Sequence, residues 1–402
     1  MSDTSGSCEL SIVMPCLNEA ETLAACILKA QAGLRKAGVK GEILIADNGS
    51  TDGSVQIAEN LGARVVHVAA KGYGCALRGG FEAAQGRWII MGDADDSYDF
   101  SEIEGFVQRL RDGDDLVMGC RLPSGGGTIM PGAMPWKNRW IGNPILSRIG
   151  RIFYQTPIRD FHCGMRGFSK SAYERMEVKT TGMEFASEMV MSATLKKMRI
   201  SEVPITLHPD GRSRPPHLKP WRDGWRHLRF MLIYSPRWLF LIPGLLLAVA
   251  GVVTGAFLLM TPMVFSNVVF DVGTLLVACM SVIVGSQLMS FGFFTKVFAI
   301  ADGLLPNDPR FARVFRYFSL EKGILAGVAL LLLGLGFLTY ALWIWKENSF
   351  GNLAYSDNLR RIIPATTCIV LGMQTVFSSF FLSVLGLKTV ASTPPECPEE
   401  SD

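Results

Sequence analysis

The stretch LSIVMPCLNE, residues 10–19, opens the pattern that indicates the fold. It predicts a short apolar strand, Leu10–Met14, followed by a polar loop and a helical pattern over Glu19–Leu34. Further strands are predicted at Glu42–Ala46, Arg64–Val68, Trp88–Gly92 and Leu116–Gly119, and further helices at Ser54–Leu61 and Ala76–Ala84. Strands that alternate with helices predict a mainly parallel sheet with helices on both faces.

Polar side chains follow the first two predicted strands. The first strand leads into Asn18 and Glu19, and the second leads into Asp47 and Asn48. Asp and Asn are common in turns, so each segment alone is most simply a loop. Ligands bind at the carboxyl ends of parallel strands, however, and two such segments at neighbouring strand ends favour a binding site.

A glycine-rich loop, Lys71–Gly74, follows the third predicted strand. The dinucleotide fingerprint would need a third glycine where Leu77 stands, and it belongs after the first strand of its unit. An NAD enzyme is therefore not favoured. The loop suits close approach to a nucleotide or its phosphates, with Lys71 as the positive charge.

The fourth predicted strand ends in Asp93-Ala94-Asp95-Asp96. Alternate residues of a strand point the same way, so Asp93 and Asp95 share a side. Two like charges repel unless a cation lies between them. Mg²⁺ and Mn²⁺ favour carboxylate oxygen and often keep substrate phosphates as ligands. The pair predicts a metal–diphosphate site, and the alternative is a solvated acidic turn.

The second half of the chain predicts membrane spans. Hydrophobic residues make up 49% of the sequence and concentrate after residue 237. A crossing helix needs about 20 mostly apolar residues. Four uncharged stretches meet that length: Trp238–Met260, Val272–Thr295, Gly323–Trp345 and Ile362–Leu387.

Charge and cysteine usage predict the orientation of these spans. Lys and Arg gather before the first stretch and in segment 296–322, whereas Thr261–Asp271 has neither. The polar segment Met1–Glu9 has no apolar core of a signal peptide, and the nine cysteines form no CxxC pair. We therefore expect a multi-pass protein of the plasma or inner membrane with its N-terminal globular domain and both termini in the cytoplasm.

These patterns also predict the domain boundaries. No internal repeat of 20–50 residues is visible. For the segment after the catalytic domain, an amphipathic helix packed on that domain is the alternative to a helix in the membrane interface. The expected parts are a disordered N-terminus 1–9, a catalytic domain 10–220, an interfacial juxtamembrane helix 221–237, a four-helix transmembrane domain 238–390 with a cytoplasmic amphipathic loop 296–322, and a disordered tail 391–402.

Residues 10–220 resemble the catalytic domain of family 2 glycosyltransferases, which has the GT-A fold. The motifs that carry this resemblance are Val13–Glu19, Asp47–Asp52 and Asp93–Asp95, in the family's order. Other segments resemble polyprenyl-phosphate sugar synthases of the dolichyl-phosphate mannose and glucose synthase type. These segments are Gly119–Arg121, Asp160–Phe168 and Glu202–Ile205.

The resemblance implies roles for individual residues. Asp93 and Asp95 bind the metal and act in catalysis together with Arg121. The implied donor-binding residues are Pro15, Leu17, Asn18, Glu19, Asp47, Asn48, Lys71, Gly72, Asp93, Ala94, Asp95, Arg212 and Arg214. The implied acceptor-binding residues are Arg121, Lys137, Arg139 and Arg148. This chain departs from the family at Ser97, where Gln is frequent, and in Asp160–Gly164, where the family has Asp-Pro-x-Ser-Gly.

The implied activity is an inverting transfer of a hexose from a nucleotide-sugar, of the GDP-mannose or UDP-glucose type, to a polyprenyl monophosphate. It takes place at the cytoplasmic membrane face and uses Mg²⁺ or Mn²⁺. The acceptor phosphate is already anionic near neutral pH, so a dedicated general base is unnecessary. Glu184 and Glu188 lie one helical turn apart and are either base candidates or a surface pair. No nucleic acid partner is expected, and homo-oligomerisation is left open.

Three alternatives remain at this point. Pro135–Arg151, which resembles the family's acceptor loop, is otherwise an exposed amphipathic helix. A processive polysaccharide synthase would carry Gln-x-x-Arg-Trp, whereas Trp136–Trp140 lacks the Gln and lies too early in the chain. A transporter of lipid-linked sugars would place ionisable groups inside its spans, and the four apolar stretches hold none.

Overall fold

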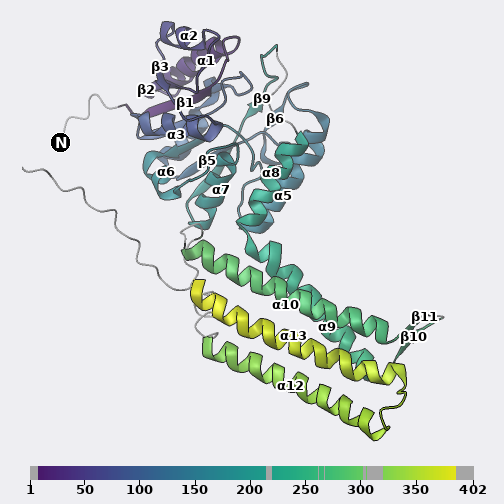
Figure 1. The fold of residues 1–402 in the computed structure, drawn as a ribbon. Coiled ribbons are helices and arrows are strands. Elements are labelled where there is room, and N and C mark those ends of the chain that lie inside the picture. Colours follow the sequence, from purple (N-terminus) through teal and green to yellow (C-terminus); the bar gives the residue numbers. More distant parts are fainter. Residues whose placement is uncertain are drawn as a thin grey trace, which may run out of the picture. The chain divides into compact units, whose positions relative to one another are not determined.

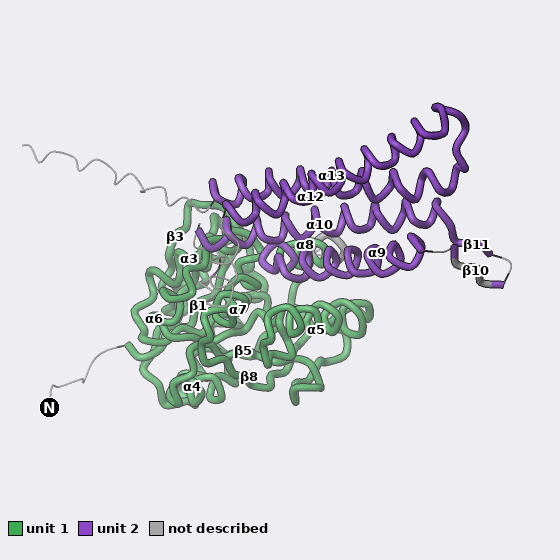
Figure 2. Tube along the Cα trace, turned by 90° about the horizontal axis from the view of Figure 1, so that it is seen from below, with its two compact units in different colours: residues 1–231 green, residues 232–402 purple. Residues whose placement is uncertain are grey.

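The computed structural model describes residues 8–213, 220–260, 262–266, 268–301, 305 and 320–385. The chain divides into two compact units, residues 1–231 and 232–402 (Figure 2). Of the predicted disordered ends, residues 1–7 and 391–402 lie outside the described residues, as does most of the predicted loop 296–322.

The first unit is built on a seven-stranded sheet in the order β3-β2-β1-β4-β7-β5-β8. Four of its strands, β1, β2, β3 and β5, are labelled in Figure 1. Its strands are β1 (Leu10–Cys16), β2 (Gly41–Asp47), β3 (Arg64–His67), β4 (Trp88–Met91), β5 (Leu116–Cys120), β7 (Arg166–Ser169) and β8 (Ile200–Pro204). All pairings are parallel except those of β7, which runs antiparallel between β4 and β5. The predicted mainly parallel, GT-A-type sheet is confirmed, and its five predicted strands are β1 to β5.

Helices pack on both faces because the strands are apolar on both sides, as in other parallel sheets. Leu10, Ile12 and Val13 of β1 are all fully buried. Ile12 and Val13 are neighbours, so their side chains point to opposite faces of the sheet. The helices are α1 (Leu23–Lys36), α2 (Ser54–Asn60), α3 (Tyr73–Ala83), α4 (Glu104–Arg111), α5 (Asn143–Tyr154), α6 (Lys170–Met176), α7 (Phe185–Leu195) and α8 (Pro220–Ile233). Short elements are η1 (Phe100–Glu102), η2 (Pro123–Gly125), the π-helical turn η3 (Asn138–Gly142), and the paired strands β6 (Thr128–Ile129) and β9 (Thr206–Leu207).

The first predicted helix starts later than expected, at Leu23 instead of Glu19. The backbone N–H of Glu19 donates to Ser54 Oγ (2.9 Å), and that of Ala20 donates to Asp52 Oδ2 (2.9 Å). These side chains take the place of a first helical turn and hold the end of β1 against the loop before α2.

The helix α8 is tied to the catalytic unit. The hydroxyl of Tyr154 donates to the carbonyl oxygen of Met231 (2.7 Å), and Ser187 Oγ lies 2.9 Å from His227 Nδ1. These contacts favour the alternative of a helix packed on the catalytic domain for residues 227–231, and the domain boundaries stay predictions. The interfacial role of segment 221–237 stays a prediction.

Among the described residues of the second unit, four helices are long and apolar enough to cross a membrane, in agreement with the four predicted spans. They are η4 with α9 (Arg237–Leu241 and Ile242–Met260), α10 (Val272–Ala301), α12 (Leu320–Glu347) and α13 (Tyr355–Leu385). A small hairpin of β10 (Met263–Phe265) and β11 (Val268–Phe270) follows α9. The helices extend beyond the uncharged stretches, so charged residues stand at their ends, and Arg360 of α13 pairs with Asp271.

Two helix hairpins, α9–α10 and α12–α13, are held by the same close contacts between glycines. A side-chain carbon placed on Gly244 would lie 2.8 Å from the carbonyl oxygen of Gly285. One placed on Gly327 would lie 2.8 Å from the carbonyl oxygen of Gly372. Small residues let membrane helices approach closely, so the same backbone contact closes each hairpin.

The two hairpins also share a sequence pattern. Residues 278–297 and 365–384 both read Ala-x₆-Gly-x-Gln-x₅-Phe-Phe-x₂-Val. The equivalent rings of Phe294 and Phe381 contact each other, with centroids 4.7 Å apart, as equivalent residues do beside a two-fold axis. The copies lie more than 80 residues apart, outside the 20–50-residue range in which no repeat is visible.

Candidate active site

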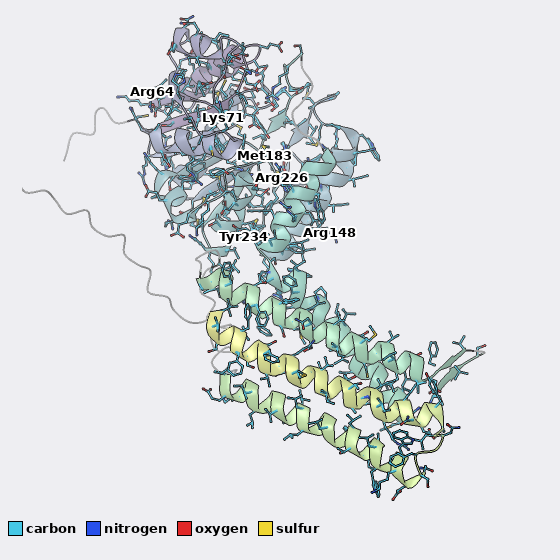
Figure 3. All side chains as sticks on the ribbon, in the orientation of Figure 1. Arg64, Lys71, Arg148, Met183, Arg226 and Tyr234 are labelled. Atoms are coloured by element: carbon cyan, nitrogen blue, oxygen red, sulfur yellow. The ribbon has the colours of Figure 1, made fainter. Side chains whose placement is uncertain are left out.

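Asn48, at the end of β2, holds the glycine-rich loop that follows β3. Its Oδ1 accepts from the backbone N–H of Gly72 (2.9 Å), and its carbonyl oxygen accepts from Lys71 Nζ (2.6 Å; Lys71 is labelled in Figure 3). Gly72 has φ of 132°, and a side chain there would meet the carbonyl oxygen of Thr181. Three predicted donor-binding residues are thus brought together at one edge of the sheet.

Asp47 and Asn18 shape the neighbouring loops. Asp47 is buried and accepts from the backbone N–H groups of Gly49 (3.1 Å) and Ser50 (3.0 Å). Burial alone would raise the pKa of Asp47, but these hydrogen bonds outweigh it and hold the pKa below its ordinary value. Asn18 Oδ1 accepts from the N–H of Thr51 (2.8 Å), which joins the β1 and β2 loops.

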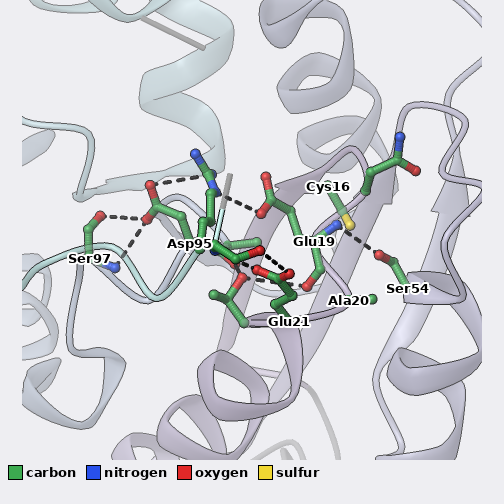
Figure 4. Close-up of polar contacts among 12 residues, drawn as sticks. Cys16, Glu19, Ala20, Glu21, Ser54, Asp95 and Ser97 are labelled. Carbon is green, nitrogen blue, oxygen red and sulfur yellow. Dashed lines mark hydrogen bonds and ion pairs between the residues drawn. The ribbon is translucent and has the colours of Figure 1, made fainter. Parts of the chain in front are cut away.

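An ion network connects the ends of β1 and β4 (Figure 4). Arg212 Nε donates to Glu19 Oε2 (2.9 Å), and its Nη2 lies 3.3 Å from Asp95 Oδ2. Burial alone would lower the pKa of Arg212, but Asp95 and Glu19 outweigh it and raise that pKa. Ser97 donates to Asp95 Oδ1 from its hydroxyl (2.5 Å) and its backbone N–H (3.1 Å). The residue in place of the family's Gln therefore orients Asp95.

Asp93 lies beside Asp95 and bonds a tyrosine. The hydroxyl of Tyr73 donates to Asp93 Oδ1 (2.9 Å). Burial of the carboxyl group and the charge of Asp95 raise the pKa of Asp93 to about 6, against the effects of Tyr73 and Arg212. The site therefore holds negative charge that its own cations do not fully compensate.

The remaining predicted donor residues lie around this network. Ala94 is buried, and its carbonyl oxygen accepts from Thr22 Oγ1 (2.7 Å). Pro15 belongs to β1, and the side chain of Leu17 just after that strand is 44% exposed. Arg214 lies outside the described residues.

The pair Asp93 and Asp95 fits a divalent cation that a substrate helps to bind. Among the described residues, no group of three or more His, Cys, Asp or Glu side chains could hold a metal. Two carboxylates nevertheless offer the hard oxygen ligands that Mg²⁺ and Mn²⁺ prefer, and substrate phosphates commonly complete such a shell.

Arg121 forms a buried ion pair that the sequence did not indicate. Its Nε and Nη2 donate to Asp160 Oδ2 (2.7 Å) and Oδ1 (2.8 Å), and both side chains are almost fully buried. Burial alone would raise the pKa of Asp160, but Arg121 outweighs it and keeps that pKa below its ordinary value. Two of the donor groups of Arg121 are thus occupied, and its predicted catalytic and acceptor-binding roles stay predictions.

The predicted acceptor region is a continuous helix through η3 and α5. Trp136 and Trp140 are exposed by 66% and 60%, and the guanidinium of Arg139 lies 5.5 Å from the ring centroid of Trp140. Lys137 and Arg148 are also exposed, and Arg148 is labelled in Figure 3. The segment is therefore an amphipathic helix with aromatic and basic side chains at its surface. Acceptor binding there stays a prediction.

Glu184 and Glu188 do not form the surface pair that was one interpretation. Glu188 is buried, and its carboxylate accepts from the backbone N–H groups of Lys179 (3.1 Å) and Thr180 (2.8 Å) and from Thr180 Oγ1 (2.6 Å). This carboxylate holds the loop at residues 179–180, and a role of either glutamate as a base stays a prediction. Glu184 precedes α7, and its Oε2 is buried with no hydrogen-bond partner among the described residues.

The sequence reasoning missed Tyr73 and Asp160 as partners of site residues. Tyr73 belongs to the glycine-rich loop Lys71–Gly74, but nothing in the sequence indicates that its hydroxyl bonds to Asp93. Asp160 stood in a segment that departs from the family motif, and its partner Arg121 lies 39 residues earlier. The contact between two residues so far apart in the chain follows from the sheet, because β5 and β7 lie side by side.

The fold and this site define a glycosyltransferase of the GT-A type joined to a membrane unit. Residues 11–176 match the family model "Glycosyl transferase family 2", and residues 293–386 match "Glycosyltransferase family 2 C-terminal transmembrane region". The low-salt glycan biosynthesis hexosyltransferase Agl6 of Haloferax volcanii is 40% identical over 381 residues, which cover 94% of this chain and 89% of Agl6. The chain belongs to glycosyltransferase family 2, and it is a membrane enzyme of sugar transfer.

Two further proteins are similar to the chain at a lower level. A dolichyl-phosphate hexose transferase of Haloferax volcanii is 28% identical over 198 residues, which cover 49% of this chain and 82% of that protein. The solved structure of glucosyl-3-phosphoglycerate synthase from Mycobacterium tuberculosis covers 57% of this chain and 78% of its own, with 19% identity and a TM-score of 0.43. That structural likeness is too low to bear on substrate or metal.

Proposed function

We propose that this enzyme transfers a hexose from a nucleotide diphosphate sugar to a polyprenyl monophosphate, with inversion and with a divalent cation. The observation that carries the proposal is the carboxylate pair Asp93 and Asp95, beside Glu19 and Arg212, in a chain that also has four helices of membrane-spanning length. The likeness to a protein named dolichyl-phosphate hexose transferase supports the acceptor class.

The residues of the chain divide the work on the donor. Asp93 and Asp95 would hold Mg²⁺ or Mn²⁺, which as a Lewis acid would offset charge on the leaving diphosphate. Arg212 supplies a positive charge that pairs with Asp95 and with Glu19. The loop at Lys71 and Gly72, held by Asn48, offers a cation and a close backbone approach to the nucleotide.

The acceptor phosphate serves as the nucleophile without a dedicated general base. The second pKa of a phosphate monoester is about 6, so this group is largely a dianion at neutral pH. Glu188 fits this scheme because its carboxylate is bound to the backbone of Lys179 and Thr180. A sugar hydroxyl as acceptor would need a base.

The acceptor headgroup would meet the basic helix of η3 and α5. Lys137, Arg139 and Arg148 can form charge-assisted hydrogen bonds to a lipid phosphate. The exposed rings of Trp136 and Trp140 suit the boundary between headgroups and acyl chains. This placement of basic and aromatic groups supports a lipid over a soluble acceptor.

The decisive experiment incubates the purified full-length enzyme and polyprenyl phosphate with separate nucleotide-sugars, including GDP-mannose and UDP-glucose. We expect one hexose to be added to the lipid, as measured by mass, with the anomeric configuration opposite to that of the donor. A polymer would favour a processive synthase. Transfer to a free sugar as readily as to the lipid would refute the acceptor class, and full activity in excess chelator would refute the metal.

We also propose the predicted domain boundaries and orientation, with residues 1–237, 296–322 and the tail in the cytoplasm. Cysteines placed at Ser266 and Ser319 of a variant without native cysteines should react with an impermeant thiol reagent from opposite sides. Sealed vesicles of each orientation give the measurement. Labelling of both positions from one side would contradict the four-span topology.

A further inference from the structure

Tyr73 connects the donor loop to a metal-binding carboxylate. It is the first residue of α3 and directly follows Lys71 and Gly72, whereas Asp93 follows β4. The tyrosine hydroxyl donates to Asp93 Oδ1 over 2.9 Å. One hydrogen bond therefore joins two parts of the site that come from different strands.

The position of Tyr73 is fixed on both sides along the chain. Before it, the N–H of Gly72 donates to Asn48 Oδ1 (2.9 Å). After it, Gly74 packs so closely on Thr181 that a side-chain carbon would lie 2.8 Å from the Thr181 carbonyl carbon. These two contacts hold the backbone on either side of Tyr73, from which its half-buried side chain reaches Asp93.

The hydroxyl of Tyr73 is the donor in this hydrogen bond, and Asp93 Oδ1 is the acceptor. A hydrogen bond to the ionised form of a carboxylate favours that form, which is the form that binds a cation.

The second oxygen of Asp93 faces a glycine. A side-chain carbon on Gly164 would lie 2.9 Å from Asp93 Oδ2 and equally close to the hydroxyl oxygen of Tyr98. The N–H of Gly164 donates to the hydroxyl of Tyr98 (2.9 Å), which holds the glycine in place. Oδ1 of Asp93 is thus engaged by Tyr73, whereas Oδ2 has no hydrogen bond to another described residue.

We propose that Tyr73 is a positioning residue that turns Oδ2 of Asp93 toward the divalent cation and couples cation binding to the donor loop. This inference rests on the metal site of the proposed function. Partners that orient a ligand from behind are worth roughly 10- to 100-fold in metal affinity. Tyr73 has this relation to Asp93, and the loop it anchors carries Lys71.

The test measures Mn²⁺ binding to the full-length protein in detergent by electron paramagnetic resonance, alone and with UDP or GDP. We expect Tyr73→Phe to raise the Kd for Mn²⁺ about tenfold or more. At saturating Mn²⁺, kcat should fall by a much smaller factor. Tyr173→Phe is the matched control, because the Tyr173 ring packs against Phe81 and Phe168 and its variant should bind Mn²⁺ like the wild type.

A second variant tests the role of Asp93 Oδ2. Gly164→Ala would place a methyl group 2.9 Å from both Asp93 Oδ2 and the Tyr98 hydroxyl oxygen, and it should also weaken Mn²⁺ binding. This variant keeps the inference testable if Tyr73→Phe lowers the unfolding temperature. Wild-type affinity in Gly164→Ala would overturn the assignment of Oδ2 as the ligand atom.

The outcomes separate this inference from the proposed function. If the wild type binds no Mn²⁺ with or without nucleotide, the proposed metal site is wrong. If the wild type binds Mn²⁺, Asp95→Asn does not, and Tyr73→Phe binds as well as the wild type, the metal site stands and the role of Tyr73 is overturned.

Discussion

The catalytic unit and the membrane unit bury opposite kinds of side chain. In the catalytic unit, large apolar residues such as Phe81 and Phe106 are inside, and even Arg166 is fully buried. In the membrane unit, large apolar residues such as Leu246 and Leu325 are exposed by 65% and 72%, and the buried positions include many glycines. The contrast shows that the solvent around a helix determines which residues it buries. Large apolar side chains gain nothing by leaving lipid, so membrane helices bury small residues at their contacts instead.

Polar groups follow the same contrast. The catalytic unit stabilises Arg121 and Asp160 in its interior by three hydrogen bonds between them, one from the backbone and two from the side chain of Arg121. In the membrane unit, the ion pair of Arg360 and Asp271 lies at the beginnings of α13 and α10. Charged groups are costly inside a bilayer, which accounts for their position at helix ends.

The largest expected effect comes from breaking the interior pair of the catalytic unit. Asp160→Asn leaves the buried guanidinium of Arg121 uncompensated, so the free energy of unfolding should fall by about 3–5 kcal/mol. Because the pKa of Asp160 is lowered in the folded state, its contribution is present at neutral pH and is lost as the pH falls through that lowered value. Chemical unfolding of the catalytic unit in the full-length protein gives the measurement.

An exposed pair supplies the control for that comparison. Lys36 Nζ lies 3.2 Å from Glu104 Oε2, with both side chains about half exposed. Lys36→Gln should change the unfolding free energy by less than about 1 kcal/mol. Equal effects of Asp160→Asn and Lys36→Gln would mean that the interior of the catalytic unit does not hold charge as described.

The next effect separates catalysis from stability at the edge of the same unit. Asp95→Asn removes a charge that faces Arg212, and kcat should fall at least a hundredfold, or about 2.7 kcal/mol. Asp96→Asn is the matched control, since Asp96 pairs with Lys29 (2.7 Å). Steady-state rates at saturating Mn²⁺ decide the point, and similar losses in both variants would argue against a specific role of Asp95.

A smaller effect is expected from the close helix contacts of the membrane unit. Gly285→Ala and Gly372→Ala force a methyl group against the backbone of the facing helix, which should cost about 1–3 kcal/mol in each hairpin. Gly336→Ala is the control because open space surrounds Gly336. Thermal unfolding in detergent should rank Gly336→Ala at or above the wild type. If all three variants behave alike, glycine contacts do not hold the hairpins.

The smallest effect concerns acceptor recognition. Arg139→Ala should raise the KM for polyprenyl phosphate roughly tenfold, equal to about 1.4 kcal/mol, and leave the KM for the nucleotide-sugar nearly unchanged. Arg109→Ala, on α4, controls for a general loss of positive charge. Kinetics with each substrate varied separately give the answer, and a change confined to the donor would reassign Arg139.

Local sequence was enough for most elements of both units. The predicted strands β1 to β5 and the four spans follow from apolar runs whose lengths and periods are properties of short segments. The acidic motif at Asp93 and Asp95 could be placed at a strand end for the same reason. Strand β7 was not predicted, and its antiparallel position between β4 and β5 depends on pairing with strands more than 40 residues away.

The sequence by itself determined the class of fold, the membrane spans and the edge of the sheet where the polar motifs gather, because periodicity and strand order are local information. Only the tertiary structure decided what each site residue contacts. In that structure, Arg121 bonds to Asp160, Glu188 bonds to the backbone of residues 179–180, and Tyr73 bonds to Asp93. The physical reason is that a hydrogen bond forms only when the donor–acceptor distance is right to within a few tenths of an ångström. Packing of the whole unit sets that distance.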